Sequence, residues 1–269
     1  MSAASVENLF KAALTGERED DVAWNAVTRL HFLGTREVLE KAIGLSQSTD
    51  SYRRARGADI LGQLGVQQGV HSTSFIPERL TCLLAMLHSE SDPVVLDAAI
   101  IALGHLGEPQ GVREVLRYSQ HSDENVRYAV AWVLPGGLGN EPEVIDTLLR
   151  LMRDSDSDVR DWATFGLGTQ SDADSPVIRD ALFDRLQDGD EDTRAEATAG
   201  LAKRKDLRAL PVVIEELGRE EYGVLYEEAA SYLLNLDVVK PEGWESWRYV
   251  EELRARFNIV DPPSDSPVQ

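Results

Sequence analysis

Leucines recur along the chain at nearly constant intervals, and each stands near the end of a stretch with helical periodicity. Successive members of this leucine series lie 31, 42, 31, 33, 34 and 32 residues apart. They are Leu30, Leu61, Leu103, Leu134, Leu167, Leu201 and Leu233. After each of them comes a segment with leucine and valine at three- and four-residue spacing, which is the spacing of one face of an α-helix. The pattern predicts a pair of helices repeated about seven times.

The second helices of these pairs follow from the same spacing. We expect them at residues 35–46, 77–88, 110–120, 142–153, 175–187, 207–218 and 244–257. Residues 5–15 predict an extra helix that caps the amino end, and the aromatic face of residues 244–257 suits a cap at the other end. The predicted fold class is all-α, a right-handed α-solenoid. One domain is expected over residues 1–258, followed by a disordered tail at 259–269.

Two places depart from the repeat. Residues 65–76 insert about ten extra residues between the helices of the second pair. Such an insertion is either a partner-contacting edge or a tolerated surface loop, since a longer loop costs little free energy. Pro135, Gly136 and Gly137 replace the usual end of the fourth first helix. Because proline lacks a backbone donor, this helix should end early or kink, which changes the local curvature or opens a notch beside Trp132.

A ladder of polar residues accompanies the leucines. An aspartate precedes a helix and an arginine follows four residues later, in the pairs Asp50 and Arg54, Asp123 and Arg127, Asp156 and Arg160, and Asp190 and Arg194. At Asp92 the fourth following residue is Leu96. An aspartate in this position caps the first turn of a helix, and an arginine can join neighbouring repeats through a carboxylate. We therefore interpret the ladder as structural, with ligand contact by exposed arginines as the alternative.

The repeats resemble a known family, the HEAT-like repeats of phycobilisome lyases. The segments that carry the resemblance are DENVRYAVAWVL from Asp123, DSDVRDWATFGLG from Asp156 and DEDTRAEATAGLA from Asp190. The resemblance implies about seven HEAT-like helix pairs. It is not specific for function, because lyase subunits, glycosylases, hydroxylases, toxin-neutralising proteins and scaffolds all share this repeat.

Charge narrows the choice of partner. The net charge is −20, and half of it falls in residues 140–200, where sixteen acidic residues face six arginines. Such a surface repels phosphates, so we expect no direct binding of nucleic acid. It attracts a basic protein, unless the acids serve only solubility and helix capping. The candidate partner-binding residues are Asp154, Asp156, Asp158, Asp161, Asp188, Asp190, Glu191, Asp192, Trp132 and Trp162.

The sequence offers little for catalysis. The five histidines are scattered, and the one cysteine, Cys82, lies in an apolar run. The repeated His-Glu pairs of the deoxyhypusine hydroxylases are missing, so we expect no metal and no cofactor. Trp132, Asp161 and Trp162 superficially match the groups of HEAT-like DNA glycosylases. Those enzymes need a cationic cleft, and this chain has the opposite sign.

The function predicted from these observations is stoichiometric protein binding and not catalysis. The acidic face would bind a basic partner, and one biological form would be an immunity or inhibitor protein that covers a toxic enzyme. The alternative is a subunit of a bilin lyase or another accessory scaffold, in which Trp132, Trp162, Tyr128 and Phe165 line a pigment groove. No membrane segment and no secretion signal is recognisable, so the cytoplasm is the expected compartment. Pairing with a second copy through either terminal cap is open.

Overall fold

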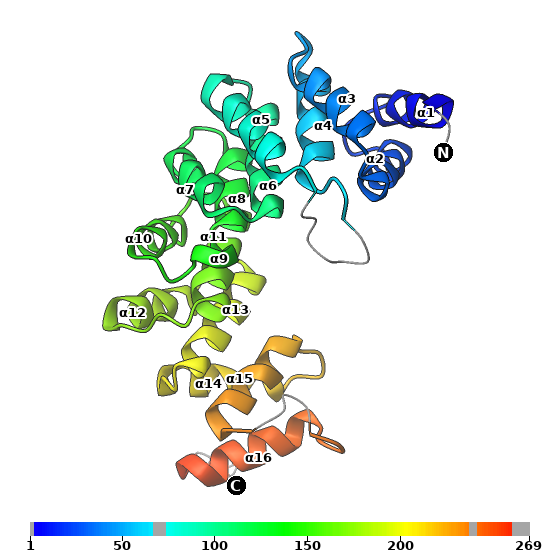
Figure 1. Cartoon of the computed structure of the whole chain (residues 1–269). Coiled ribbons are helices and arrows are strands. Elements are labelled where there is room, and N and C mark those ends of the chain that lie inside the picture. The colour runs from blue at the N-terminus through cyan, green and yellow to red at the C-terminus, as the bar shows by residue number, and fades with distance from the viewer. Residues whose placement is uncertain (1–2, 67–73, 237–240, 260–269) are drawn as a thin grey trace, which may run out of the picture. The chain divides into compact units, whose positions relative to one another are not determined.

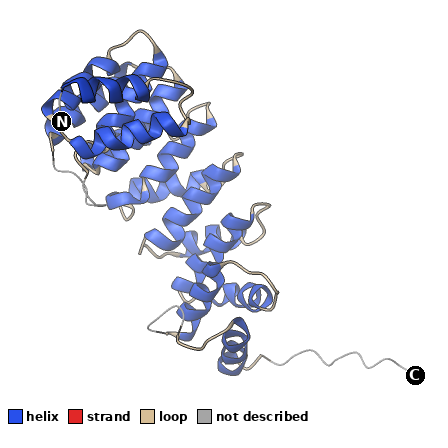
Figure 2. Ribbon diagram, turned by 90° about the vertical axis from the view of Figure 1, so that its right-hand side faces the viewer, coloured by secondary structure: helices blue, strands red, loops and turns tan. Residues whose placement is uncertain are grey.

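The fold is helical throughout the part of the chain that the structure describes. A computed structural model describes residues 3–66, 74–236 and 241–259. Within these ranges there are helices, turns and loops, and no strand (Figure 2). The predicted all-α fold class is confirmed.

The described helices of each unit form successive pairs, as the leucine spacing predicts. The first helices of the pairs are α2 (Asp21–Leu33), α4 (Ser51–Gly62), α6 (Pro93–Leu106), α8 (Glu124–Val133), α11 (Ser157–Phe165), α13 (Glu191–Lys203) and α15 (Val224–Leu234). The second helices are α3 (Arg36–Ser46), α5 (Ile76–Ser89), α7 (Pro109–Val115), α10 (Pro142–Leu151), α12 (Pro176–Arg185), α14 (Leu210–Leu217) and α16 (Ser246–Phe257) (Figure 1). Short 3-10 turns follow α7 at Leu116–Tyr118 and precede α14 at Leu207–Ala209. The α-solenoid of helix pairs is confirmed, with each predicted second helix matched by an observed one.

The core is built from the leucine series. All seven leucines are buried, and none of them is more than 2% exposed. Successive first helices approach closely because small residues separate them. A Cβ added to Gly200 of α13 would lie 2.7 Å from the Cα of Gly168, which lies in a π-helical turn (Gly166–Gln170) after α11. Any side chain at Gly200 would therefore push the two repeats apart.

Two buried arginines tie the helix ends together. Arg79 of α5 donates to the carbonyls of Leu61 and Gly62 at 2.6 Å each, at the end of α4. Arg204, after α13, donates to the carbonyls of Leu167 and Gly168 at 2.7 Å each. These carbonyls have no partner within their own helix, so the guanidinium groups take the place of solvent.

The two predicted breaks have different outcomes. Helix α8 ends at Val133 and a separate one-turn helix, α9 (Pro135–Leu138), follows it. The expected early end of the fourth first helix is therefore confirmed. Of the insertion at residues 65–76, residues 67–73 lie outside the described residues. Phe75, just before α5, has a positive φ of 55° and stacks under the Arg36 guanidinium, whose carbon lies 4.4 Å from the ring centre.

The chain separates into two compact units, Met1–Leu151 and Met152–Gln269. In the first unit, α1 (Ala3–Ala13) packs on α2, as expected of an amino-terminal cap. In the second unit, α16 packs on α14 and α15. A single domain over residues 1–258 stays a prediction, and residues 260–269 of the predicted tail lie outside the described residues. None of the helices in the described ranges is long and apolar enough to cross a membrane.

Candidate functional site

The aspartates of the ladder cap the helices that follow them. The side chain of Asp50 accepts a hydrogen bond from the Arg53 amide at 3.1 Å, and Asp156 accepts one from Val159 at 3.1 Å. Asp123 and Asp190 make equivalent bonds to the first turns of α8 and α13. Asp92 caps α6 in the same way. Each bond satisfies an amide that has no partner within its helix.

The arginines of the ladder bind a different set of acceptors. In the first unit, Arg54 pairs with Glu90 at 2.7 Å and donates to the carbonyls of Ser48 and Thr49. In the second unit, Arg160 pairs with Asp188 at 2.8 Å and donates to the carbonyls of two residues before α11. Both carboxylates belong to the next repeat, so each pair joins two neighbouring repeats.

The other two arginines contact the turn before their own helix. Arg127 donates to the carbonyls of His121 and Ser122, at 2.9 and 3.1 Å. Arg194 donates to the carbonyl of Asp188 at 2.8 Å. These contacts occupy the arginines with the backbone of the repeat.

The acids that pair with Arg54 and Arg160 were not singled out for this role by the ladder. Glu90 and Asp188 stand two residues before the capping aspartates Asp92 and Asp190, and each accepts a hydrogen bond from the amide of that cap. The signal that could have identified them is the motif of an acid, any residue and a capping aspartate. Asp154 repeats this contact with the Asp156 amide at 3.0 Å.

Asp188 requires a correction. The sequence places it among the partner-binding candidates, but its side chain is only 3% exposed. Both carboxylate oxygens are occupied, one by Arg160 and the other by Arg160 and by Arg185 at 2.8 Å. Burial acts to raise the pKa of Asp188, but the hydrogen bonds from Arg160 and the Asp190 amide, together with the charges of Arg160 and Arg185, outweigh it and lower the pKa below its ordinary value. Asp188 is therefore a structural residue and has no free oxygen for a partner.

The remaining candidate acids differ in exposure. Asp158, Glu191 and Asp192 are exposed on the first turns of α11 and α13. Asp154, Asp156, Asp161 and Asp190 are half-buried. Asp156 and Asp190 cap helices, and Asp154 accepts a hydrogen bond from the amide of a capping aspartate. Asp161 is the half-buried candidate that takes no part in a helix cap.

Asp161 belongs to a row of four carboxylates on three adjacent first helices of the second unit. The row consists of Asp161 on α11, Asp192 and Glu196 on α13, and Glu228 on α15, and we call it the acidic row. Among the described residues, no arginine, lysine or histidine forms an ion pair with any of the four. Within the part of the chain that the structure describes, the polar contacts of the row are the Tyr232 hydroxyl on Glu228 at 2.8 Å and the Thr169 hydroxyl on Glu196 at 3.5 Å.

The row is electrostatically costly for the folded chain. Burial, together with the charges of Asp192, Asp190 and Asp158, raises the pKa of Asp161 to about 6. Burial and the nearby charges of Asp161 and Glu228 raise the pKa of Glu196 to about 8. The Oδ1 atom of Asp161 is buried and has no hydrogen-bond donor in the described structure. Like charges and burial both disfavour ionisation, so a nearby cation would relieve both.

The sequence predicts Asp161 and Asp192 as candidate partner-binding residues, but it does not predict Glu196 and Glu228. Asp161 and Glu228 both stand five residues after the residue that precedes their helix, and Glu196 stands six residues after Asp190. Comparing the repeats at this position would have identified Glu228. The charge count alone could not, because Glu228 lies outside residues 140–200.

The two candidate tryptophans lie in different units. Trp132 packs edge-on against His105, with ring centres 5.0 Å apart. Trp162 packs edge-on against Phe165, with ring centres 5.5 Å apart. Both are half-buried, so each contributes to packing within its own unit and leaves part of its ring accessible. A pigment groove shared by these aromatic residues stays a prediction.

In the described ranges, no group of three or more histidine, cysteine, aspartate and glutamate side chains is arranged to hold a metal ion.

The chain is similar to several solved structures and matches the model of one protein family. No curated protein matches the chain. The crystal structure of YibA from Escherichia coli is similar, with a TM-score of 0.70, 22% sequence identity, and coverage of 94% of this chain and 98% of YibA. An engineered protein is similar at a TM-score of 0.56 and 15% identity, covering 95% of this chain and 79% of its own length. A second engineered protein has a TM-score of 0.54 and 18% identity, and it covers 81% of this chain and 96% of its own length.

These similarities concern the fold alone, because the identities are low. The family is shown by a match of a different kind. The model of the HEAT repeats matches residues 80–168 and 145–233, which together span more than half of the sequence. The chain belongs to the HEAT-repeat family.

Proposed function

We propose that this HEAT-repeat protein is a non-catalytic binding protein whose acidic row receives a positively charged segment of a protein partner. The observation that carries the proposal is the absence of a built-in cation. In the part of the chain that the structure describes, the four carboxylates of the row have no basic side chain paired with them, and Asp161 Oδ1 has no donor. An arginine or lysine from a partner would supply the positive charge that the row lacks.

Neighbouring acids support this choice of surface. Asp158 and Glu191 lie exposed on the same helices, α11 and α13, and extend the negative surface beyond the row. Trp162 follows Asp161 and is half-buried, so the face of its ring is a candidate contact for a guanidinium. Repeat proteins generally use their extended surface for protein interactions, which agrees with a row spread over three repeats.

In its most specific form, the proposal makes the partner a cationic enzyme that this chain inhibits. A nuclease, for example, binds phosphate through basic residues, and these would complement the acidic row. The bilin-lyase and DNA-glycosylase alternatives stay predictions from the sequence, since no described contact favours either.

The test compares two variants in which the same number of carboxyl groups is replaced by amides. The row variant carries Asp161→Asn, Asp192→Asn, Glu196→Gln and Glu228→Gln. The control variant carries Glu220→Gln, Glu221→Gln, Glu242→Gln and Glu245→Gln, four exposed acids of the second unit. Binding of a fluorescein-labelled, arginine-rich peptide of twelve residues and of cytochrome c is measured by fluorescence anisotropy and calorimetry over a range of salt concentrations.

The row variant should lose binding by at least about tenfold, and the control variant by less than about threefold, because paired charges act at short range. Binding by the unaltered chain should weaken as salt rises. An equal loss in both variants would mean that only net charge matters and would contradict the proposal. Binding that persists unchanged near 1 M salt would exclude charge as the driving force.

A further inference from the structure

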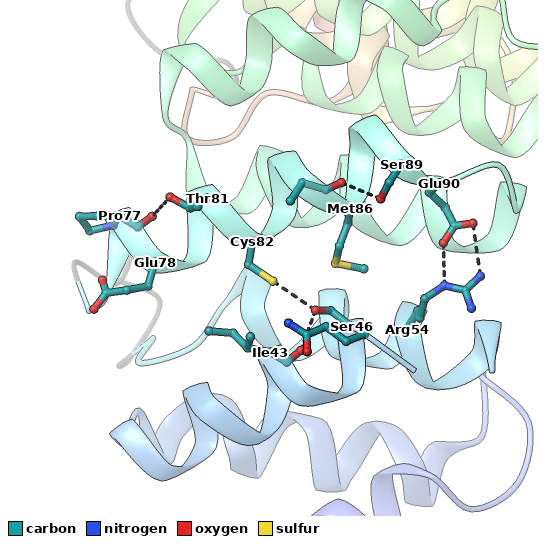
Figure 3. Close-up of a pocket in the computed structure, with 12 residues that line it drawn as sticks. Ile43, Ser46, Arg54, Pro77, Glu78, Thr81, Cys82, Met86, Ser89 and Glu90 are labelled. Carbon is teal, nitrogen blue, oxygen red and sulfur yellow. Dashed lines mark hydrogen bonds and ion pairs between the residues drawn. The ribbon is translucent and has the colours of Figure 1, made fainter. Parts of the chain in front are cut away.

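A groove runs between the second helices α3 and α5 of the first unit, away from the acidic row in the sequence. Its volume is about 640 Å³. Ile43 and Ser46 of α3 form one wall, and Cys82 and Met86 of α5 form the other (Figure 3). The Ser46 hydroxyl and the Cys82 thiol lie 3.2 Å apart and connect the two walls.

An ion pair stands near each end of the groove. Arg36 of α3 pairs with Glu78 of α5 at 3.0 Å. At the other end, Arg54 of α4 pairs with Glu90 through two nitrogens, at 2.7 and 3.3 Å. Glu78, Arg54 and Glu90 are the charged residues that line the groove, and each is already neutralised. A charged ligand would find no unpaired charge in these walls.

The hydroxyl groups of the walls are also satisfied. The hydroxyls of Ser46, Thr81 and Ser89 donate to carbonyls of their own helices at 2.7–2.8 Å. Their oxygens can still accept a hydrogen bond from a ligand. The surface between them consists of Ile43, Pro77, Ala85 and Met86 side chains. The groove is therefore mainly apolar, and its polar groups are a few hydroxyl acceptors and the Gln47 side-chain amide.

The walls are held in place independently of any ligand. Arg79 is only 1% exposed and binds α5 to the end of α4 through the carbonyls of Leu61 and Gly62. Helix α3 also packs against α4. Because both walls are anchored to the same helix, the groove does not depend on an occupant for its shape.

We propose that this groove binds a neutral, predominantly apolar small molecule with at most a hydroxyl as its polar group. The volume lies within the range of roughly 300–1,000 Å³ that is usual for small-molecule sites. The paired charges favour a neutral ligand over an anion or a cation. A helical protein segment would need an interface of about 1,000 Å² and would normally use unpaired charges at the rim, which the charged lining residues do not provide. This inference is independent of the acidic row.

The chain itself carries the reporter for a test, because Cys82 is its one cysteine and lies in the groove wall. Alkylation of Cys82 by the neutral reagent N-ethylmaleimide is followed by mass spectrometry, with and without 1-decanol below its solubility limit. Burial raises the pKa of the Cys82 thiol, so the reaction is run at about pH 8.5, where more thiolate is present. In parallel, the neutral dye Nile red is titrated by fluorescence, with 1-decanol as competitor.

Two variants locate the bound molecule. Ala85→Trp places a large side chain at an exposed position of the groove wall, and Val177→Trp makes a comparable change at an exposed position of α12 in the second unit. Saturating 1-decanol should slow the alkylation of Cys82 by about tenfold in the unaltered chain. Nile red binding should be lost in Ala85→Trp and kept in Val177→Trp, with helix content checked by circular dichroism.

Alkylation of Cys82 at the same rate with and without 1-decanol would overturn the proposal whether or not Ala85→Trp folds. Nile red binding that survives Ala85→Trp would place the dye elsewhere and would also overturn it. If an amphipathic helical peptide protected Cys82 while 1-decanol did not, the groove would be a protein-docking site, contrary to the inference.

Discussion

The two units differ in whether a carboxylate at the same position of a first helix has a basic partner. Asp97 of α6 and Asp161 of α11 each stand five residues after the aspartate that caps their helix. Asp97 pairs with Arg18 at 2.7 Å, and Asp59 of α4 pairs with the same arginine at 2.9 Å. Asp161 has no basic partner among the described residues and is surrounded by further acids.

The difference lies in one arginine outside the first helices. Arg18 precedes α2 and reaches carboxylates of both α4 and α6, while Arg56 of α4 adds a second contact to Asp59 at 3.2 Å. Burial acts to lower the pKa of Arg18. The carboxylates of Asp59 and Asp97 act in the other direction and outweigh burial, so the pKa of Arg18 is raised. Burial still raises the pKa of Asp97, with Arg18 opposing it. The first unit thus pairs Asp59 and Asp97 with an arginine of its own, whereas the acidic row of the second unit has no basic partner among the described residues.

The overall charge agrees with this contrast. Residues 1–151 contain 20 acidic and 13 basic residues, whereas residues 152–269 contain 27 acidic and 14 basic residues. The excess negative charge of the second unit is therefore larger, and it includes the row that lacks ion pairs. Negative charge on a surface keeps a protein soluble. Half-buried carboxyl groups that lie beside further acids lower the stability of the fold, however, and solubility does not require them.

Removing Arg18 should have the largest effect. Arg18→Met would leave Asp97 buried without a cation and Asp59 with only Arg56. The free energy of unfolding should fall by about 3 kcal/mol, since breaking a buried ion pair leaves an uncompensated charge. Urea denaturation at pH 7, followed by circular dichroism, measures the change. Adding Asp97→Asn to the variant should restore part of the loss, and an unchanged midpoint for Arg18→Met would remove the contrast between the units.

Replacing Glu196 should change the free energy of unfolding less than replacing Arg18, and in the opposite direction. Its pKa is raised to about 8 in the folded chain, so between pH 4.5 and pH 8 the folded state holds a proton that the unfolded state has released. The contribution of Glu196 to the free energy of unfolding is therefore fully present below pH 4.5 and is lost as the pH rises to 8. Glu196→Gln should raise the free energy of unfolding by about 2 kcal/mol at pH 8, which is roughly half of what the full pKa shift corresponds to, because solvent around the half-buried side chain screens its charge. At pH 4 the free energy of unfolding should be unchanged.

The control for this prediction is a series of denaturation curves from pH 4 to pH 9. The variant should lack the slope between pH 6 and pH 8 that the unaltered chain shows. Asp161, whose pKa is about 6, would still contribute a slope at lower pH in both proteins. A Glu196→Gln variant that is less stable than the unaltered chain at pH 8 would mean that the Glu196 charge is compensated.

The ladder should give the smallest effects and should not distinguish the units. Arg54→Ala in the first unit and Arg160→Ala in the second each remove an ion pair to the next repeat and two bonds to backbone carbonyls. Because these arginines are partly exposed, each change should cost only about 1–1.5 kcal/mol. Thermal unfolding measures both variants. A much larger loss for one of them would show that the repeats do not use the ladder equally.

The sequence predicts well what depends on neighbours along the chain. The leucine series and the three- and four-residue spacing identify the core and the helices, because one repeat is a local unit whose period is visible. The capping aspartates follow from chemistry within one turn. The early end of α8 follows from Pro135.

What escaped prediction depends on residues distant in the sequence. Arg18 lies 41 and 79 residues from the two acids that it neutralises. Nothing in the pattern shows that it serves Asp97 and that no equivalent serves Asp161. Asp188 was misassigned for the same reason, since its burial depends on Arg160 of the preceding repeat. The charge count found the right region, but only the packing of α11, α13 and α15 separates paired acids from unpaired ones.

The central claim is that no cation of the described chain compensates the carboxyl groups of the acidic row, so that the fold disfavours the ionisation of Asp161 and Glu196. Carbon-detected NMR titration of the side-chain carboxyl groups tests it most directly, with Glu196→Gln and Asp161→Asn used to assign the signals. We predict midpoints near pH 8 for Glu196 and near pH 6 for Asp161. Midpoints at or below the ordinary values of 4.5 for Glu196 and 3.8 for Asp161 would contradict the account.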